Sequence, residues 1–325
     1  MPPSTDSLYI RLPNWIGDVC MSLPVLHALC VPGRQTYICA RPWARDLLAG
    51  IPASGFVPMT GRFLDDRSSV ASHRRANVAK ARGLLLPDSL SSAAVFRLAG
   101  VPSAGWRDDG RSLMLAWPFT KPAERLHAVE AWYRLACLAQ AAWGEPALPE
   151  SPPPKLDLPL TAQHEAQADS ALAQHGLTNQ SFILIAPTAT GLHKGKVKVW
   201  PHYDELTRSL VADGHRVVYC VPSAEAEQAK ANAPLAEALA PMSLGAFATL
   251  TRRARLVICN DSGVSHLAAA AGAQQITLFG VTSATRTGPW SAHAICLGDD
   301  MSWPATEDVV QRVHSVLSSP CRPIY

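Results

Sequence analysis

The stretch 260–266, Asn-Asp-Ser-Gly-Val-Ser-His, combines an acid, hydroxyls, a glycine and a histidine between two apolar segments. The apolar run before it reads as a strand and the alanine-rich run after it as a helix. Asp261 or Ser262 can cap that helix, and Gly263 lets another molecule approach the backbone. Because a helix amino terminus carries unpaired N–H groups and partial positive charge, we predict that this turn is a phosphate-binding site. His266 is a further candidate contact, with a structural role as the alternative.

A second candidate for chemistry is Asp18. The sequence 11–18, Arg-Leu-Pro-Asn-Trp-Ile-Gly-Asp, reads as a strand end and a turn, which places Asp18 near the start of the next helix. A carboxylate there can take the proton from a hydroxyl that attacks an electrophilic sugar carbon, or it can simply cap the helix. Gly17 would give a substrate room. Trp15 can stack on a sugar ring or pack in the core.

Lysines crowd the loop that follows another apolar run, 182–186. Such a run of lysines is usually a solvated surface, but its place after the carboxyl end of a predicted strand favours contact with a leaving diphosphate. We assign this role to Lys194 and Lys196, with Thr188 beside them, although Lys198 is spaced just as closely. The spacing alone does not say which lysine makes the contact.

A polar loop after the apolar run 275–279 offers further donor contacts. Thr285 and Arg286 can touch the ribose, base or phosphate of a nucleotide, and a plain surface loop is the alternative. Missing motifs narrow the chemistry: the sequence has no Gly-x-Gly-x-x-Gly after the first strand, no Walker A, no Asp-x-Asp and no zinc-ligand spacing. We therefore expect lysine and backbone N–H groups, without a metal or a cofactor, to stabilise a leaving diphosphate.

Alternating strand-like and helix-like segments would position these residues. Strands are expected at 8–12, 36–40, 56–59, 83–86, 182–186, 216–221, 255–259 and 275–279. Helices are expected at 17–29, 42–49, 69–80, 89–98, 124–142, 203–213, 223–232, 244–253 and 306–317. This alternation predicts an α/β fold with parallel sheets, in which ligands collect at the carboxyl ends of the strands.

The length of 325 residues predicts two domains. Six prolines between residues 146 and 160 exclude helix and central strand there and favour a stiff linker. We place an N-terminal acceptor domain at 1–145, a C-terminal nucleotide-sugar domain at 161–305, and a terminal helix and tail at 306–325. Two such domains favour a substrate cleft between them.

The composition, 48% hydrophobic and 17% charged, is typical of globular proteins and argues against disorder. A net charge of +3 does not indicate a nucleic-acid partner. The eight cysteines form no Cys-x-x-Cys pair, which favours buried free thiols in the cytoplasm. Neither a signal-peptide pattern nor an apolar stretch of about 18 residues is evident.

Several of these motifs, taken together, resemble the ADP-heptose:lipopolysaccharide heptosyltransferases of glycosyltransferase family 9. The corresponding segments follow in the family's order: 13–18 with 21–24, 86–93 with 98–102, 105–107 with 110–111, 260–263 with His266, and 278–280 with 286–290. The Pro-Asn-Trp-Ile-Gly-Asp form is closer to the second heptosyltransferase than to the first. The sequence departs from the family where Asp88 replaces the usual asparagine and where loop 188–199 is longer than usual.

The resemblance implies a GT-B fold, in which two Rossmann-like domains face each other across a cleft. It also implies inverting transfer of L-glycero-D-manno-heptose from ADP-heptose to the inner core of lipopolysaccharide, with Asp18 as catalytic base. Loop 194–198 and turn 261–263 would hold ADP, and the tail helix would pack back on the first domain. The candidates on the acceptor side are Trp15, Gly17, Asp88 and Ser89.

The implied acceptor, a lipid A bearing Kdo or heptose, is anchored in a membrane. We therefore expect a cytoplasmic protein, peripheral at the inner membrane. Basic residues can meet anionic lipid or core phosphates, with a solvated helix face as the alternative: Arg62, Arg67, Arg74, Arg75, Lys80 and Arg82. The competing functions are a related transferase with another nucleotide sugar or a protein acceptor, and a non-catalytic nucleotide-sugar-binding homologue. The intact Asp18 and Asp261 turn argue against the non-catalytic one.

Overall fold

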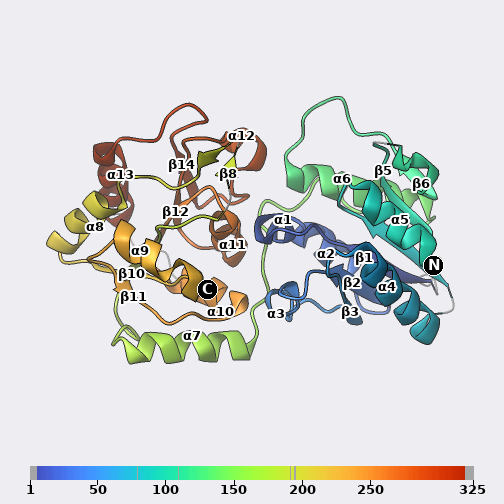
Figure 1. The fold of residues 1–325 in the computed structure, drawn as a ribbon, viewed down its shortest axis with the longest axis horizontal. Coiled ribbons are helices and arrows are strands. Elements are labelled where there is room, and N and C mark those ends of the chain that lie inside the picture. The colour runs from blue at the N-terminus through green and yellow to red at the C-terminus, as the bar shows by residue number, and fades with distance from the viewer. Residues whose placement is uncertain (1–5, 79, 109, 191, 194, 319–325) are drawn as a thin grey trace. The chain divides into compact units, whose positions relative to one another are not determined.

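The chain divides into two compact units, Met1–Pro153 and Pro154–Tyr325. A computed structural model describes residues 6–78, 80–108, 110–190, 192–193 and 195–318; for 192, 193 and 286 it describes the backbone alone. The division falls between Pro153 and Pro154, inside the segment 146–160, which contains neither helix nor strand. Each unit is an α/β domain with its own sheet (Figure 1).

The first domain is built on a six-stranded parallel sheet in the order β3-β2-β1-β4-β5-β6. Its strands are β1 (Ser7–Arg11), β2 (Thr36–Ala40), β3 (Gly55–Pro58), β4 (Ala81–Leu85), β5 (Ser103–Trp106) and β6 (Trp117–Phe119). Its helices are α1 (Ile16–Met21), α2 (Leu23–Leu29), α3 (Ala44–Leu47), α4 (Phe63–Asn77), α5 (Leu90–Leu98) and α6 (Ala128–Ala142), with a 3-10 turn at Arg111–Leu113.

The second domain repeats this plan in a parallel sheet of order β11-β10-β7-β12-β13-β14, with a separate hairpin, β8-β9. Its strands are β7 (Phe182–Ala186), β8 (Leu192–His193), β9 (Lys196–Val197), β10 (Arg216–Tyr219), β11 (Glu237–Ala238), β12 (Leu256–Asn260), β13 (Gln275–Leu278) and β14 (Ala294–Leu297). Its helices are α7 (Ala162–Gln174), α8 (Tyr203–Ala212), α9 (Ala226–Asn232), α10 (Leu244–Arg253), α11 (Gly263–Ala271), α12 (Ala284–Thr287) and α13 (Thr306–Ser318), with a 3-10 turn at Ser223–Glu225.

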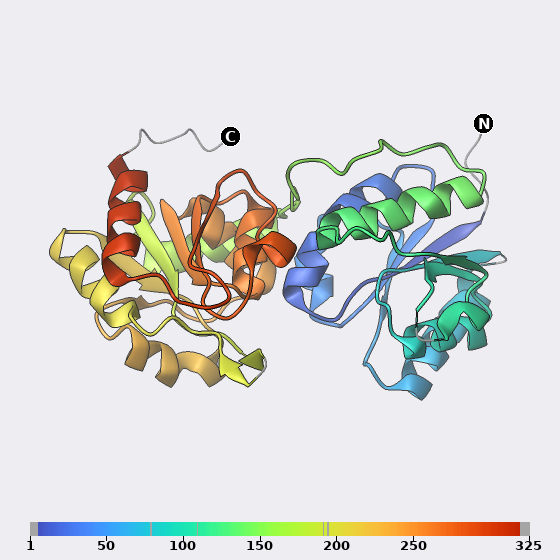
Figure 2. The same cartoon turned by 90° about the horizontal axis from the view of Figure 1, so that it is seen from above.

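The central strands are the apolar runs of the sequence. Every residue of β1, β2, β7 and β12 is buried, because helices cover both faces of each sheet (Figure 2). A strand covered on both sides shows a continuous apolar run in place of alternation. The predicted α/β fold with two parallel sheets is therefore confirmed.

The expected helix 17–29 is broken in two. Helix α1 ends at Met21 and α2 begins at Leu23, with Ser22 between them. Pro24 lacks the N–H that a continuous helix would use at this point, so the chain restarts with proline in the first turn of α2. The break confines Asp18 to a helix of six residues.

The tail helix α13 belongs to the core of the second domain. Its residues Val309 and Val313 are fully buried in the core of the second domain, together with Trp200 and Leu206. The hydroxyl of Thr306 also donates to Glu205 Oε2 of α8 at 2.7 Å. The valines lie four residues apart on one face, which matches the apolar side of α8. Helix α13 therefore completes the second domain's core, and the tail 319–325 of the predicted segment 306–325 lies outside the described residues.

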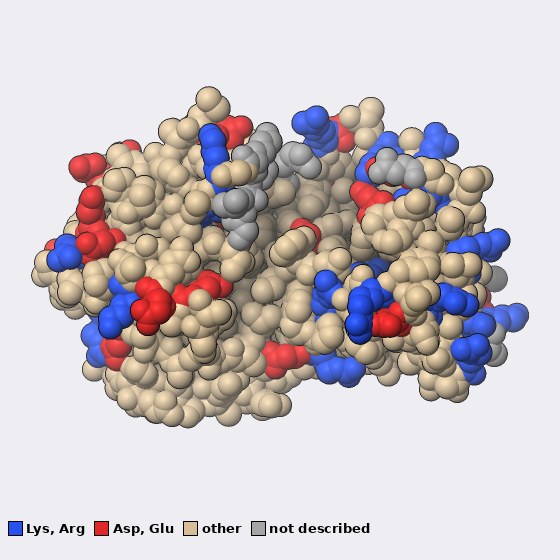
Figure 3. All heavy atoms as spheres, in the orientation of Figure 1, with Lys and Arg blue, Asp and Glu red and all other residues tan. Residues whose placement is uncertain are grey.

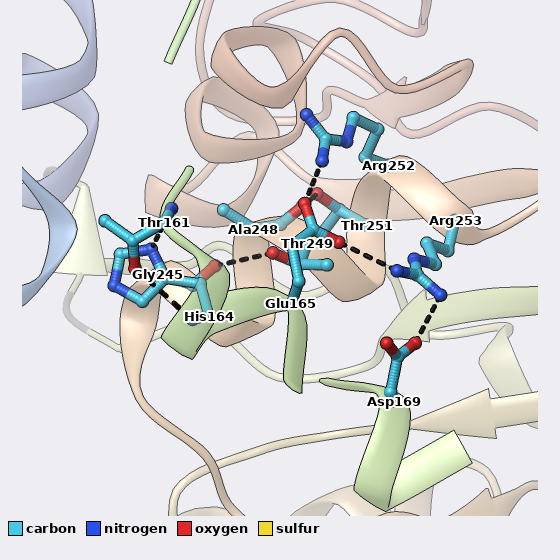
Figure 4. Close-up of polar contacts among 10 residues, drawn as sticks. All are labelled: Thr161, His164, Glu165, Asp169, Gly245, Ala248, Thr249, Thr251, Arg252 and Arg253. Carbon is cyan, nitrogen blue, oxygen red and sulfur yellow. Dashed lines mark hydrogen bonds and ion pairs between the residues drawn. The ribbon is translucent and has the colours of Figure 1, made fainter. Parts of the chain in front are cut away.

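Helix α7, which follows the proline-rich segment, is fastened to α10 (Figure 4). Glu165 pairs with Arg252 and, at 2.8 Å, with Arg253, which also pairs with Asp169. The ring of His164 fills the space above Gly245, where an added Cβ would lie 2.3 Å from it. Because α10 leads directly into β12, this contact supports the strand that carries the 260–266 turn.

Candidate functional site

Each sheet has one point where the strand order reverses, and the candidate residues follow the strands at these points. In the first domain the chain continues from β1 to β2 on one side and returns to β4 on the other. In the second domain the same reversal lies between β7 and β12. Ligands of open parallel sheets bind at the carboxyl edge beside such a switch point. The loops after β1 and β4, and those after β7 and β12, are therefore the candidate sites.

The loop after β1 is held in place by its own strand end. The buried Arg11 guanidinium donates to Leu12 O and, at 2.7 Å, to Asn14 Oδ1. Trp15 is 76% exposed, as a stacking residue would need, and Gly17 is buried in the first turn of α1. The loop thus presents a large aromatic ring beside Asp18.

Burial raises the pKa of the Asp18 carboxyl to about 6. Ser22 donates both its N–H and its hydroxyl to the backbone oxygen of Asp18, not to the carboxylate. Within the described parts of the chain, no group forms a hydrogen bond or an ion pair with that carboxylate. Capping does not account for Asp18, since α1 has no side-chain cap. A desolvated carboxylate with a pKa near neutrality is suited to general base catalysis.

The loop after β4 brings Asp88 and Ser89 to the same edge. Leu86 N–H donates to Arg11 O at 3.1 Å, which joins this loop to the end of β1. Ser89 caps α5 by accepting from Ser92 N–H. The Asp88 carboxylate is half-exposed and pairs with Lys121 at 2.7 Å.

Two basic side chains, Lys121 and Arg111, lie next to the Asp88 carboxylate. Lys121 bridges Asp88 and, at 2.6 Å, Asp108. Arg111, which is wholly buried, donates to Pro87 O at 2.9 Å and lies 3.6 Å from Asp88 Oδ1. The sequence motifs included Arg111 in segment 110–111 without giving it a role, and they did not include Lys121, because an isolated basic residue carries no signal until the fold places it.

Asn260 organises the site of the second domain. Its side-chain oxygen accepts from Trp200 N–H at 2.9 Å, and its amide donates to Ala186 O at 3.1 Å and Thr188 O at 3.3 Å. One buried amide therefore ties the end of β12 to the end of β7 and to the start of α8. The lysine loop is anchored at both its ends by this side chain.

Lys198 is the lysine that the structure places at the turn. Its Nζ lies 3.2 Å from Asp261 Oδ2, and Thr282 Oγ1 donates to the same oxygen at 2.5 Å. Lys196 lies exposed in the β8-β9 hairpin, and Lys194 lies outside the described residues. Of the three closely spaced lysines, sequence reasoning gave Lys198 least weight, because the contact with Asp261 depends on tertiary structure.

Ser262 is the cap of α11: its hydroxyl accepts from Val264 N–H at 3.3 Å. Gly263 is the first residue of that nine-residue helix, so its backbone lies where partial positive charge is greatest. His266 is buried, with 6% of its surface exposed. The strand–turn–helix expected at 255–272 is present as β12 and α11.

The other residues expected to contact the nucleotide sugar are Thr188, Thr285 and Arg286. The Thr188 hydroxyl donates to Glu225 Oε2 at 2.5 Å, at the end of β7. Thr285 lies exposed in α12 and hydrogen-bonds Ser283 at 2.8 Å. The side chain of Arg286 lies outside the described residues. Where the chain is described, no group of three or more His, Cys, Asp or Glu is arranged to hold a metal ion.

Known proteins are similar to this chain over most of its length. The model of glycosyltransferase family 9 (heptosyltransferase) matches residues 72–314. Lipopolysaccharide heptosyltransferase 2 of Escherichia coli K12 is 27% identical over 310 residues, which covers 87% of this chain and 85% of that protein. Lipooligosaccharide heptosyltransferase 2 of Haemophilus ducreyi is also 27% identical, with 88% and 86% covered.

Solved structures agree on the fold. The E. coli ADP-heptose lipopolysaccharide heptosyltransferase II has a TM-score of 0.74 at 23% identity, with 96% of this chain and 98% of that chain covered. A family 9 glycosyltransferase of Veillonella parvula has a TM-score of 0.82 at 17% identity, with 98% of each chain covered. The resemblance drawn from the sequence motifs is confirmed. The chain belongs to glycosyltransferase family 9, the heptosyltransferases.

Proposed function

We propose that this protein is an inverting heptosyltransferase that moves L-glycero-D-manno-heptose from ADP-heptose to the inner core of lipopolysaccharide. The observation that carries the proposal is the Asp18 carboxylate, half-buried, with a pKa raised to about 6 and without a partner in the described structure, at the switch point of a family 9 glycosyltransferase. Its relatives are heptosyltransferases, among them the E. coli ADP-heptose lipopolysaccharide heptosyltransferase II.

In this mechanism Asp18 takes the proton from a hydroxyl of a Kdo or heptose residue on the acceptor. The hydroxyl oxygen then bonds to the anomeric carbon of the donor heptose. The bond from that carbon to the β-phosphate oxygen breaks, and its electron pair leaves with ADP. Attack on the face opposite ADP inverts the anomeric configuration. A pKa of about 6 leaves Asp18 ionised at neutral pH yet able to accept a proton.

We propose that the second domain stabilises the charge on the departing ADP. Lys198 offers an ammonium group beside α11, and the amino end of α11 at Gly263 offers backbone N–H groups. Asp261 and Thr282 fix Lys198 and the turn in position. These groups act here in place of a bound metal ion, so turnover is expected to be unchanged by a chelator.

We place the acceptor on the first domain. Trp15 can cover a sugar ring, while Asp88 and Ser89 lie at the edge next to the Asp18 loop. The acceptor is a lipid A that carries Kdo or heptose, so the protein would act at the cytoplasmic face of the inner membrane as a peripheral protein. None of the helices described in the chain is long and apolar enough to cross a membrane.

The test is a transfer assay with purified protein, two acceptors and a donor panel. ADP-heptose with Kdo-lipid A or with its heptosylated form should give a product heavier by one heptose residue, together with free ADP. ADP-glucose, GDP-mannose and UDP-glucose serve as control donors. No heptosylated product with either acceptor, or faster transfer from a control donor, would reject the proposed function.

A further inference from the structure

A basic groove of about 280 Å³ lies on the first domain, along α4 and the carboxyl end of α5. We define this α4–α5 groove by its lining residues Arg67, Ser68, Ala71, Arg74, Arg75, Leu98, Ala99 and Gly100. The α4 members recur with helical spacing, so they form one continuous stripe on that helix. Three of the eight are arginines and none is an acid.

The basic residues of this region differ in whether an acidic side chain pairs with them. Arg62 pairs with Asp65 at 2.6 Å, and Arg82 pairs with Asp6 at 3.0 Å. Arg67 and Arg75 are exposed and form no hydrogen bond or ion pair with any described part of the chain. Two unneutralised guanidinium groups therefore face the same groove.

The third arginine is fixed in place. Arg74 Nε donates to Ala99 O, at the carboxyl end of α5, at 3.0 Å. Its guanidinium packs flat against Gly100, where an added Cβ would lie 3.2 Å from Nη2 and where φ is +75°. A glycine is thus needed both for the backbone and for the arginine above it. One guanidinium is preorganised, and two exposed ones flank it.

Like charges that line one groove repel each other and do not stabilise the fold. Their arrangement suits an anion: guanidinium groups form paired hydrogen bonds with phosphate oxygens. On the face drawn in Figure 3, Lys and Arg side chains gather over the part where α4 and α5 lie in Figure 1. Residues 1–153 carry 16 Lys and Arg against 12 Asp and Glu, whereas residues 154–325 carry 13 against 14.

The α4–α5 groove is separate from the candidate site. Helices α4 and α5 run antiparallel to the strands, so their carboxyl ends, with Arg75 and Gly100, lie at the edge where strands begin. Asp18 and Asp88 follow the opposite, carboxyl ends of strands. A phosphate held in the groove is therefore not the diphosphate of the donor.

We propose that the α4–α5 groove binds the phosphate group of an anionic lipid headgroup, through Arg67, Arg74 and Arg75. This source rests on the proposed function, because a lipid-anchored acceptor requires the protein to work at a bilayer. Each arginine near an anionic surface adds to binding, and the groove would fix which face of the first domain lies on the membrane. Free phosphate has the same chemistry and is the second arm of the test.

The test removes Arg67 and Arg75 together, as Arg67→Gln/Arg75→Gln, and keeps Arg74 because it caps α5. The matched control is Lys230→Gln/Arg312→Gln, which removes two exposed charges from the second domain. Binding is measured by flotation with vesicles of phosphatidylglycerol and phosphatidylcholine, and with phosphatidylcholine alone. The groove variant should bind the anionic vesicles about 30-fold more weakly than the wild type, and the control less than about 3-fold.

The proposal would be overturned if both variants lost the same affinity for anionic vesicles, or if the wild type did not bind anionic vesicles at all. Calorimetry with inorganic phosphate distinguishes a lipid headgroup from free phosphate. If the groove variant also loses affinity for inorganic phosphate, the groove binds any phosphate; if it loses affinity for vesicles alone, the groove needs a bilayer. The Tm of the groove variant should not fall. Turnover of the groove variant with a deacylated acceptor should stay within about 2-fold of the wild-type value. Vesicle binding does not depend on activity, so it still tests the groove if the protein transfers no heptose.

Discussion

The two switch points use their polar residues in opposite ways. At the β1/β4 edge the Asp18 carboxylate is desolvated and unpaired within the described structure, and its pKa is raised to about 6. At the β7/β12 edge, Asn260 and Asp261 are both buried and both partnered. The first arrangement keeps a proton acceptor reactive, while the second keeps a turn rigid. A transferase that must deprotonate one substrate and hold another needs both.

Of the two arrangements, only the one at Asp18 lowers the stability of the folded protein. A partly desolvated, unpaired carboxylate destabilises the folded protein at neutral pH, whereas a buried amide with all its hydrogen bonds made does not. Strained or destabilised groups that persist in a fold are commonly those that serve function. The same contrast predicts that substitution of Asp18 will damage activity but not folding, and that substitution of Asn260 will damage both.

The largest expected effect is that of Asp18→Asn on turnover. Loss of a general base typically lowers the rate about 10²–10⁴-fold, and the isosteric amide keeps the local packing. Calorimetric affinity for ADP should be unchanged, because ADP is assigned to the second domain. In the wild type, kcat/KM should rise with pH up to about 6 and then level off. Near-normal turnover of the variant would show that Asp18 is not the base.

Asn260→Ala should destabilise the protein by about 3 kcal/mol. The substitution leaves the buried Trp200 N–H and Ala186 C=O without partners, and each such group costs about 1–3 kcal/mol. Asn77→Ala is the control, since that amide is exposed and makes one local hydrogen bond, to His73 O. Chemical denaturation measures both variants. Equal stability of the two would mean that Asn260 does not organise the lysine loop.

The fold was largely predictable from local signals. Long apolar runs predicted β1, β2, β7 and β12, and the tail helix 306–317 was placed almost residue for residue by its valines and its first threonine. The short strands β5, β6, β11 and β14 were missed, because runs of two to four residues are too short to show a periodicity. Helix α7 was missed as well: its buried residues are two alanines, a histidine and one leucine, which form no marked apolar stripe, and ion pairs to α10 help to fasten it.

The site was predictable only in part. Asp18 and the 261–263 turn stand out because they sit at strand-to-helix transitions, which sequence patterns reveal. Which lysine lies at the Asp261 turn depends on where the loop folds back; of Lys196 and Lys198, it is Lys198 that contacts Asp261, and Lys194 lies outside the described residues. The sequence did not reveal that α13 completes the second domain's core, because an amphipathic stripe indicates that a helix packs but not against which domain.

The pH dependence of stability should also separate the two edges. Because the pKa of Asp18 is raised in the folded state, the folded protein binds this proton more tightly, and stability falls as pH rises from about 4 to about 6. Asp18→Asn removes that penalty. The variant should be more stable than the wild type by about 2 kcal/mol at pH 8 and should lose this advantage at pH 4. Urea denaturation at the two pH values checks it; an advantage that is the same at both would assign the effect to packing.

The smallest expected effect distinguishes the lysines of the second domain. Lys198→Gln removes the ammonium group next to Asp261 and leaves that carboxylate with Thr282. The carboxylate would then repel the diphosphate, so the affinity for ADP should fall about 10-fold, a typical magnitude for one charged contact in a partly buried site. Lys196→Gln is the matched control, because Lys196 is exposed in the β8-β9 hairpin and should change the affinity less than about 2-fold. The reverse order in calorimetric titrations would move the diphosphate contact from the Asp261 turn to the hairpin.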